Sequence, residues 1–166
     1  MLILFDCDGV LVDSEVLATR ELQRYLEDLS FPTGLVQKNQ DNFTGLSLLD
    51  IRKFIETQAG RTLPEDFERE LRRRDVEAFH RDLRAIDGVR DTLSTLDFAR
   101  CVASSGSQEK IRHSLTITGL IQYFDPNLFS AQDQQVRRGK PAPDLFLHAA
   151  KSMGFQPNRC LVIEDS

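Results

Sequence analysis

The sequence has no hydrophobic run long enough for a membrane span or for the core of a signal peptide. Its longest apolar start, Met1 to Phe5, ends abruptly at Asp6. A spanning helix needs roughly 20 apolar residues, and the apolar part of a signal peptide has about 7–15. We therefore expect a cytoplasmic protein that does not have a membrane as a partner.

Basic residues are also fewer than acidic residues. The 166 residues include 21 Lys and Arg against 26 Asp and Glu, which gives a formal net charge of −5. The basic residues are scattered, so the sequence offers no basic stripe for a polyanion. This distribution argues against nucleic acid as a partner.

Cysteine is sparse, with only Cys7, Cys101 and Cys160. These residues lack the close spacing of a zinc site and the density of a disulfide scaffold. Each lies in or beside a short apolar run, so we expect reduced, small core residues. No Cys-His or Ser-His-Asp arrangement for nucleophilic catalysis is indicated.

What the sequence does contain is a set of three short apolar runs, at residues 1–5, 101–103 and 160–163. Such runs are typical of strands that are buried on both faces of a parallel sheet. Helical patterns lie between them, with Ser107 as an expected N-cap and Gly154 as an expected C-terminal stop. The alternation predicts an α/β fold with a doubly wound parallel sheet.

The stretch from residue 15 to residue 84 has a different periodicity. Its apolar residues recur at helical spacing, and it contains no comparable strand run. We assign residues 15–84 to an inserted α-helical cap domain, and residues 1–14 with 85–166 to a catalytic core. An insert after the first strand would emerge above the strand ends, where such a module can exclude water from a site.

The end of the sequence is unusual for an α/β domain. The last apolar run delivers Glu164, Asp165 and Ser166 without a following helix. A parallel strand needs helices packed on its faces. We therefore expect the sequence to be truncated at its C-terminus, with the fold continuing beyond Ser166.

Polar clusters follow the three apolar runs, and the carboxyl ends of parallel strands are where ligands bind. Asp6 and Asp8 flank a single residue, and two carboxylates this close must share a proton or bind a cation. With Asp165 they offer oxygen donors, the ligand type that Mg²⁺ prefers. A carboxylate left free can attack phosphorus, which indicates phosphoryl transfer.

Charge on a transferred phosphoryl group needs further stabilisation. The hydroxyl and backbone N–H groups of residues 104–107, and the ammonium of Lys140, are candidate donors. Taken singly, strand-end serines are typical turn residues, and a loop lysine is typically solvated. Their order relative to Asp6 and Asp165 is what favours a common site.

These motifs, in this order, resemble the haloacid dehalogenase superfamily, in its β-phosphoglucomutase and sugar-phosphate phosphatase branch. The first motif, DxDGxxxD, spans residues 6–13, and the second is Ser104 after a strand. The third is Lys140 in Gly-Lys-Pro-x-Pro, and the fourth is residues 164–166. The resemblance implies a Rossmann-like core with a helical cap.

The resemblance also implies roles for the motif residues. Asp6 is the nucleophile, and Asp8 is the general acid and then the general base. The expected Mg²⁺ ligands are Asp6, the carbonyl of Asp8, and Asp165, with Glu164 supporting the metal site.

Substrate binding is expected at two places. The phosphate is expected to bind at the second and third motifs, through Ser104, Ser105, Gly106 and Lys140. Within the insert, a loop containing Thr44 and Gly45 resembles the loop that such caps lower onto the substrate.

The function implied by the resemblance is a Mg²⁺-dependent phosphatase, a phosphoric monoester hydrolase that forms a phosphoaspartate. Its substrate would be a small phosphorylated metabolite, namely a sugar phosphate or a sugar-acid phosphate such as 6-phosphogluconate. Dehalogenase relatives lack an acidic residue two positions after the nucleophile, so Asp8 disfavours that activity. We take a monomer as the default state.

Two alternatives stay open: a phosphosugar mutase of the β-phosphoglucomutase type, and a catalytically silent fragment that binds phosphorylated ligands. Related mutases are expected to carry a histidine twelve residues after the nucleophile, where this sequence has Ala18. A methyl group cannot make the hydrogen bond of that histidine, which favours hydrolysis.

A row of arginines, residues 72–74, is the remaining charged feature. It has the composition of a substrate grip for anions, but a charge run on an amphipathic helix is usually a solvated face. We predict that these arginines pair with Glu68 and Glu70 instead of binding substrate.

Overall fold

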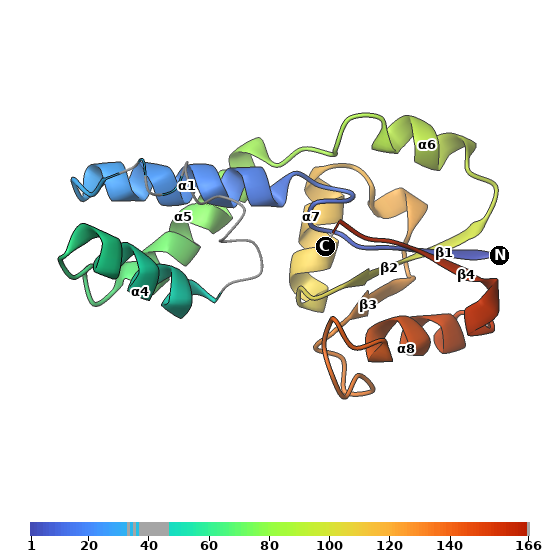
Figure 1. Ribbon diagram of the computed structural model, residues 1–166. Helices are drawn as coiled ribbons and strands as arrows, with labels where there is room; N and C mark the ends of the chain where they lie inside the picture. The colour runs from blue at the N-terminus through green and yellow to red at the C-terminus, as the bar shows by residue number, and fades with distance from the viewer. Residues whose placement is uncertain (33, 35, 37–46, 166) are drawn as a thin grey trace. The chain divides into compact units, whose positions relative to one another are not determined.

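The computed structural model describes residues 1–32, 34, 36 and 47–165. The chain divides into two compact units (Figure 1). One unit consists of residues 1–14 and 83–166, and the other of residues 15–82.

A parallel sheet forms the centre of the first unit. Its strands are β1 (Leu2–Phe5), β2 (Ala99–Ser104), β3 (Leu128–Ser130) and β4 (Cys160–Ile163), in the order β3-β2-β1-β4. Each neighbouring pair runs parallel. The predicted α/β fold with a parallel sheet is therefore confirmed, although the sequence pattern did not reveal the three-residue strand β3.

The helices of this unit are α6 (Val89–Thr95), α7 (Gln108–Ile117) and α8 (Asp144–Ser152), with 3₁₀ turns η1 (Ile121–Tyr123) and η2 (Pro157–Arg159). The predicted caps are present. Ser107 accepts a hydrogen bond from the Lys110 N–H at the start of α7. Gly154 follows the end of α8 with a φ of 77°, in the left-handed region that glycine readily adopts.

The core of this unit forms where α8 packs on the sheet, and Figure 1 shows α6 on the opposite side. Leu2 and Leu4 of β1 pack with Leu145 and Ala149 of α8. Within the described residues, the expectation of burial on both faces is wrong for β4, where Leu161 is 46% exposed and Val162 38%. Successive side chains of a strand point to opposite faces, so both faces of this edge strand are only partly covered.

The second unit contains α1 (Ser14–Asp28), α4 (Leu48–Ala59) and α5 (Phe67–Asp82). The helical spacing read from the sequence is confirmed, because Leu22, Leu26 and Leu71 are buried in one cluster. Tyr25 and Phe67 stack in this core, with ring centroids 5.3 Å apart. Across the described parts of both units, no helix is long and apolar enough to cross a membrane.

Candidate active site

Three carboxylates meet at the carboxyl edge of the sheet. Phe5 of β1 pairs with Ile163 of β4, so the residues that follow them, Asp6 and Glu164, emerge at the same level. The Asp6 N–H donates a hydrogen bond to the Ile163 carbonyl at 3.0 Å, which fixes this alignment. Carboxylate oxygens of Asp6, Glu164 and Asp165 lie within 4.8 Å of one another. We call these three residues the carboxylate cluster.

Lys140 supplies a positive charge to this cluster. Its ammonium is 3.0 Å from Asp6 Oδ1 and 2.6 Å from Glu164 Oε1. The side chain of Lys140 is only 15% exposed, so water screens these ion pairs weakly. Burial raises the pKa of the Glu164 carboxyl above its ordinary value, although the Lys140 ammonium acts in the opposite direction.

The carboxylate cluster fits a divalent cation by both charge and ligand type. Three carboxyl groups share this confined space with a single ammonium, so acidic groups outnumber basic ones. Carboxylate oxygens are the ligands that Mg²⁺ prefers in proteins, and like charges this close are unfavourable without a cation. Of the expected metal residues, Asp6, Glu164 and Asp165 are thus brought together, whereas the carboxyl group of Asp8 has other partners.

Gly9 makes room for this cluster. It has a φ of 77°, and a Cβ atom added to it would lie 1.8 Å from Asp165 Oδ2. The backbone turns sharply here, because the N–H groups of Leu11 and Val12 both donate to the Cys7 carbonyl. Glycine is therefore required at this position both by conformation and by the approach of Asp165.

We expect Gly9→Ala to weaken Mg²⁺ binding at least tenfold, about 1.4 kcal/mol, because the new methyl group displaces the Asp165 carboxylate. Calorimetric titration of the protein with MgCl₂ measures this directly. The matched control is Gly154→Ala, since Gly154 also has a φ of 77° but no atom lies within 4 Å of its added Cβ. Equal Mg²⁺ affinities in the two variants would contradict the steric argument.

The side chain of Asp8 contacts residues outside the carboxylate cluster. Its Oδ2 is 2.8 Å from Lys110 Nζ, and its Oδ1 accepts a hydrogen bond from Ser14 Oγ at 2.5 Å. Sequence reasoning did not identify Lys110 or Ser14. The only available indication was that Lys110 lies six residues after Ser104, in the first turn of a helix that begins at the strand end.

The loop after β2 carries the other candidate phosphate donors. Ser104 is buried at the end of the strand, and its Oγ accepts a hydrogen bond from the Gly106 N–H at 3.1 Å. Ser105 is exposed and Gly106 is partly exposed. Ser130, at the end of β3, donates its hydroxyl to the Gly106 carbonyl at 2.6 Å, so two neighbouring strands fix this loop.

The predicted cap loop and Cys7 are two further features of the sequence. Thr44 and Gly45 lie outside the described residues. Cys7, between the two aspartates, is buried, and burial together with the charges of Asp8 and Asp6 raises the pKa of its thiol far above the ordinary value. A thiol that stays protonated is a poor nucleophile, so Cys7 is a core residue.

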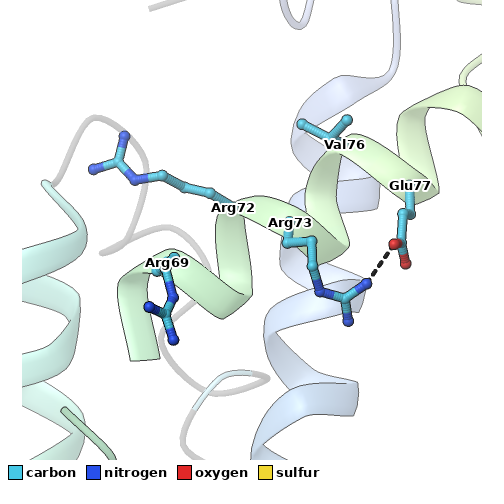
Figure 2. A pocket seen from close by; sticks show the side chains of 5 residues that line it. All are labelled: Arg69, Arg72, Arg73, Val76 and Glu77. Carbon is cyan, nitrogen blue, oxygen red and sulfur yellow. Dashed lines mark hydrogen bonds and ion pairs between the residues drawn. The ribbon is translucent and has the colours of Figure 1, made fainter. Parts of the chain in front are cut away.

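The arginine row lies on α5, where Figure 2 shows Arg69, Arg72, Arg73, Val76 and Glu77 around an open hollow. Arg73 pairs with Glu70 and Glu77, which supports a solvated, ion-paired face.

The partners of this row differ in part from the prediction. Arg74 pairs with Glu70 as predicted, and also with Asp28. The predicted role of Glu68 is wrong, because Glu68 pairs with Arg52 of α4. Arg52 reaches Glu68 across the packed helices, a contact that linear spacing along α5 does not reveal.

Comparison with known proteins agrees with the chemistry of this site. A family model described as haloacid dehalogenase-like hydrolase matches residues 1–166. The chain is also 33% identical over 165 residues to the 6-phosphogluconate phosphatase of Escherichia coli, covering 99% of this chain and 73% of that protein.

Solved structures give the same result. The chain is similar to a haloacid dehalogenase-like protein from Agrobacterium tumefaciens, with a TM-score of 0.89, 38% identity, and coverage of 99% of this chain and 74% of that one. It is also similar to a haloacid dehalogenase family hydrolase from Deinococcus radiodurans, with a TM-score of 0.86 and 30% identity, covering 99% and 72%. The latter structure contains bound phosphate and sodium.

Proposed function

The chain belongs to the haloacid dehalogenase-like hydrolase family and is a phosphoric monoester hydrolase, and we propose that it hydrolyses a small phosphorylated sugar or sugar acid with Asp6 as nucleophile. The observation that carries this proposal is the ion pair between Lys140 and Asp6, at 3.0 Å and largely shielded from water. An ammonium in that position pairs with the aspartate and can also neutralise charge on the phosphate that it attacks.

The geometry of Asp6 supports its role as nucleophile. The Cys7 N–H donates to Oδ1 at 2.7 Å, and Lys140 pairs with the same oxygen. Neither contact involves Oδ2. One oxygen therefore orients the carboxylate, while the other is available to attack phosphorus.

The proposed reaction has two steps that balance in protons. In the first, an Asp6 oxygen bonds to phosphorus, the ester P–O bond breaks, and the leaving oxygen takes a proton from the Asp8 carboxyl. In the second, a water oxygen bonds to phosphorus, the P–O bond to Asp6 breaks, and Asp8 takes a proton from that water. Asp6 and Asp8 are then restored, and the products are the alcohol and inorganic phosphate.

The proposed cofactor is Mg²⁺, held by the carboxylate cluster. When bound, it would supply Lewis-acid stabilisation of phosphate charge. Around it, Lys140 and the loop of residues 104–107 would bind the phosphate oxygens. The domain that carries these residues is the first unit, and residues 15–82 are proposed to form the cap.

Asp165→Asn tests the metal site. We expect the apparent Mg²⁺ affinity to fall by roughly ten- to a hundredfold, because a neutral amide replaces one of the three clustered carboxylates. Activity should return at least in part at high MgCl₂ concentration, as measured by phosphate release across a metal titration. An Asp165→Asn protein with wild-type metal dependence would exclude Asp165 as a ligand.

The substrate class rests on relatives. A bacterial relative that is 33% identical over nearly the whole chain acts on 6-phosphogluconate. Another, 27% identical, is a phosphatase of phosphorylated carbohydrates from Thermotoga maritima. We therefore place phosphorylated sugars and sugar acids first among candidate substrates.

The test is a panel of phosphate esters incubated with the protein and Mg²⁺, with release of inorganic phosphate measured for each. We expect a sugar or sugar-acid phosphate to give the highest kcat/KM. A parallel incubation with β-glucose 1-phosphate and a trace of the 1,6-bisphosphate tests the mutase alternative. Glucose 6-phosphate formed faster than inorganic phosphate would overturn the proposal.

A further inference from the structure

Asp8 is held at both carboxylate oxygens by residues outside the carboxylate cluster. Lys110 Nζ is 2.8 Å from Oδ2, and Ser14 Oγ is 2.5 Å from Oδ1. Lys110 comes from α7, 102 residues further along the chain. The ion pair therefore connects the loop of the two aspartates to the helix that follows the Ser104 loop.

The position of Lys110 is set by that same loop. The backbone N–H of Lys110 donates a hydrogen bond to the Ser107 side chain at 3.2 Å. This bond fixes the backbone of Lys110 in the first turn of α7. A Cβ atom on Gly106 would lie 3.3 Å from Lys110 Cδ, which shows that the lysine stem runs closely past Gly106. The ammonium thus reaches Asp8 along the candidate phosphate loop.

This ion pair contributes little to folding. The side chain of Lys110 is 43% exposed and that of Asp8 is 24% exposed. Ion pairs with this degree of solvent exposure contribute little to the stability of a protein. The contact is made to Asp8, the proposed proton donor. A role in the reaction therefore explains it better than a role in folding.

The donor chemistry of the two partners differs. An ammonium has only donors, so the Asp8 oxygen that faces Lys110 cannot direct a proton toward it. A hydroxyl both donates and accepts, so the Ser14 contact is compatible with a proton on Oδ1. The two contacts, one to each oxygen, therefore fix the orientation of the Asp8 carboxyl group.

We propose that Lys110 is a positioning residue that holds the Asp8 carboxyl in the orientation in which it gives a proton to the leaving oxygen. The inference rests on the proposed function. Lys110 itself gains and loses no proton: the proton moves from Asp8 to the leaving oxygen, and is regained from the water that attacks the phosphoaspartate.

The test compares two esters that differ in their need for acid help. One is the panel's best sugar or sugar-acid phosphate, whose alkoxide is a poor leaving group, and the other is p-nitrophenyl phosphate. We expect Lys110→Met to lower kcat on the sugar phosphate by about 10–100-fold and on the aryl ester by less than about threefold. KM should stay within about threefold, because the lost interaction acts in the transition state.

Companion variants separate positioning from structure. Lys110→Arg keeps the charge and should recover most of the lost kcat, whereas Lys151→Met removes a lysine from the exposed end of α8 and should change neither ester. In an Asp8→Asn background, Lys110→Met should cost no further activity, because both changes act through one group. Lys110→Gln replaces the Met variant if the latter does not fold.

The outcomes are distinguishable. Equal losses on the two esters, a large rise in KM, or additive losses in the double variant would each overturn the inference, since Lys110 would then bind phosphate or act independently. An active wild type with a fully active Lys110→Met protein would overturn the inference alone. A wild type that releases phosphate from no ester would overturn the proposed function, and this inference with it.

Discussion

Asp6→Asn is expected to lower phosphate release at least a thousandfold, about 4 kcal/mol at roughly 1.4 kcal/mol per decade. The substitution removes the attacking oxygen and one carboxylate of the cluster. The Asn carbonyl can still accept the hydrogen bond from the Cys7 N–H, so the backbone turn should persist. The loss is therefore expected in kcat without a loss of fold.

Stability separates the chemical effect of this substitution from a structural one. The substitution removes one of three clustered negative charges but also one of the two ion pairs of Lys140, so the metal-free Asp6→Asn protein should melt close to the wild type. The control is Asp97→Asn, at an exposed aspartate of the same unit, which should keep full activity. Turnover by Asp6→Asn within about tenfold of wild type would exclude Asp6 as nucleophile.

A covalent intermediate gives a second readout. Acid-quenched wild-type protein should carry a phosphoryl group that hydroxylamine removes, as expected for an acyl phosphate, and Asp6→Asn should carry none. Phosphoryl label retained by the variant would assign the nucleophile to another residue.

The sequence predicts the parts of this site that belong to local patterns. Apolar runs that end in acidic residues predicted β1 and β4 and placed Asp6 and Asp165 at strand ends, because burial on the sheet and exposure at its edge both follow from residue type. β3 was missed since three residues carry no recognisable period. Its place at the edge of the sheet depends on pairing with β2, which local sequence does not encode.

Contacts between distant segments were also beyond local patterns. A lysine in the first turn of an amphipathic helix has the sequence features of a solvated residue, and nothing near Lys110 in the chain indicates Asp8. The same holds for Lys140, whose double ion pair with Asp6 and Glu164 depends on two strand ends meeting the loop that precedes α8. The motif resemblance supplied Lys140 as a candidate but not its partners.

Lys140→Met is expected to lower kcat by about a hundred- to a thousandfold, the usual effect of removing one donor that stabilises developing charge. The ammonium contacts Asp6 and Glu164, and its side chain is 15% exposed, so no bulk water replaces it readily. Met keeps an unbranched apolar side chain and removes only the ammonium, which also lies 5.2 Å from the centroid of the Phe146 ring. Lys151→Met, at an exposed site on α8, is the matched control and should be fully active.

The charge of the carboxylate cluster provides a measurement that does not depend on turnover. Without the ammonium, three carboxylates remain close together with no cation, so the metal-free Lys140→Met protein should melt at a lower temperature than the wild type. Added Mg²⁺ should then raise the melting temperature of the variant by more than it raises that of the wild type. Without the ammonium the carboxylate cluster should bind Mg²⁺ more tightly, and a ligand that binds only the folded state stabilises that state according to its affinity. Lys140→Arg retains the charge and should behave like the wild type in this melting experiment. An unchanged metal-free melting temperature, with the same response to Mg²⁺, would show that Lys140 does not neutralise the carboxylate cluster.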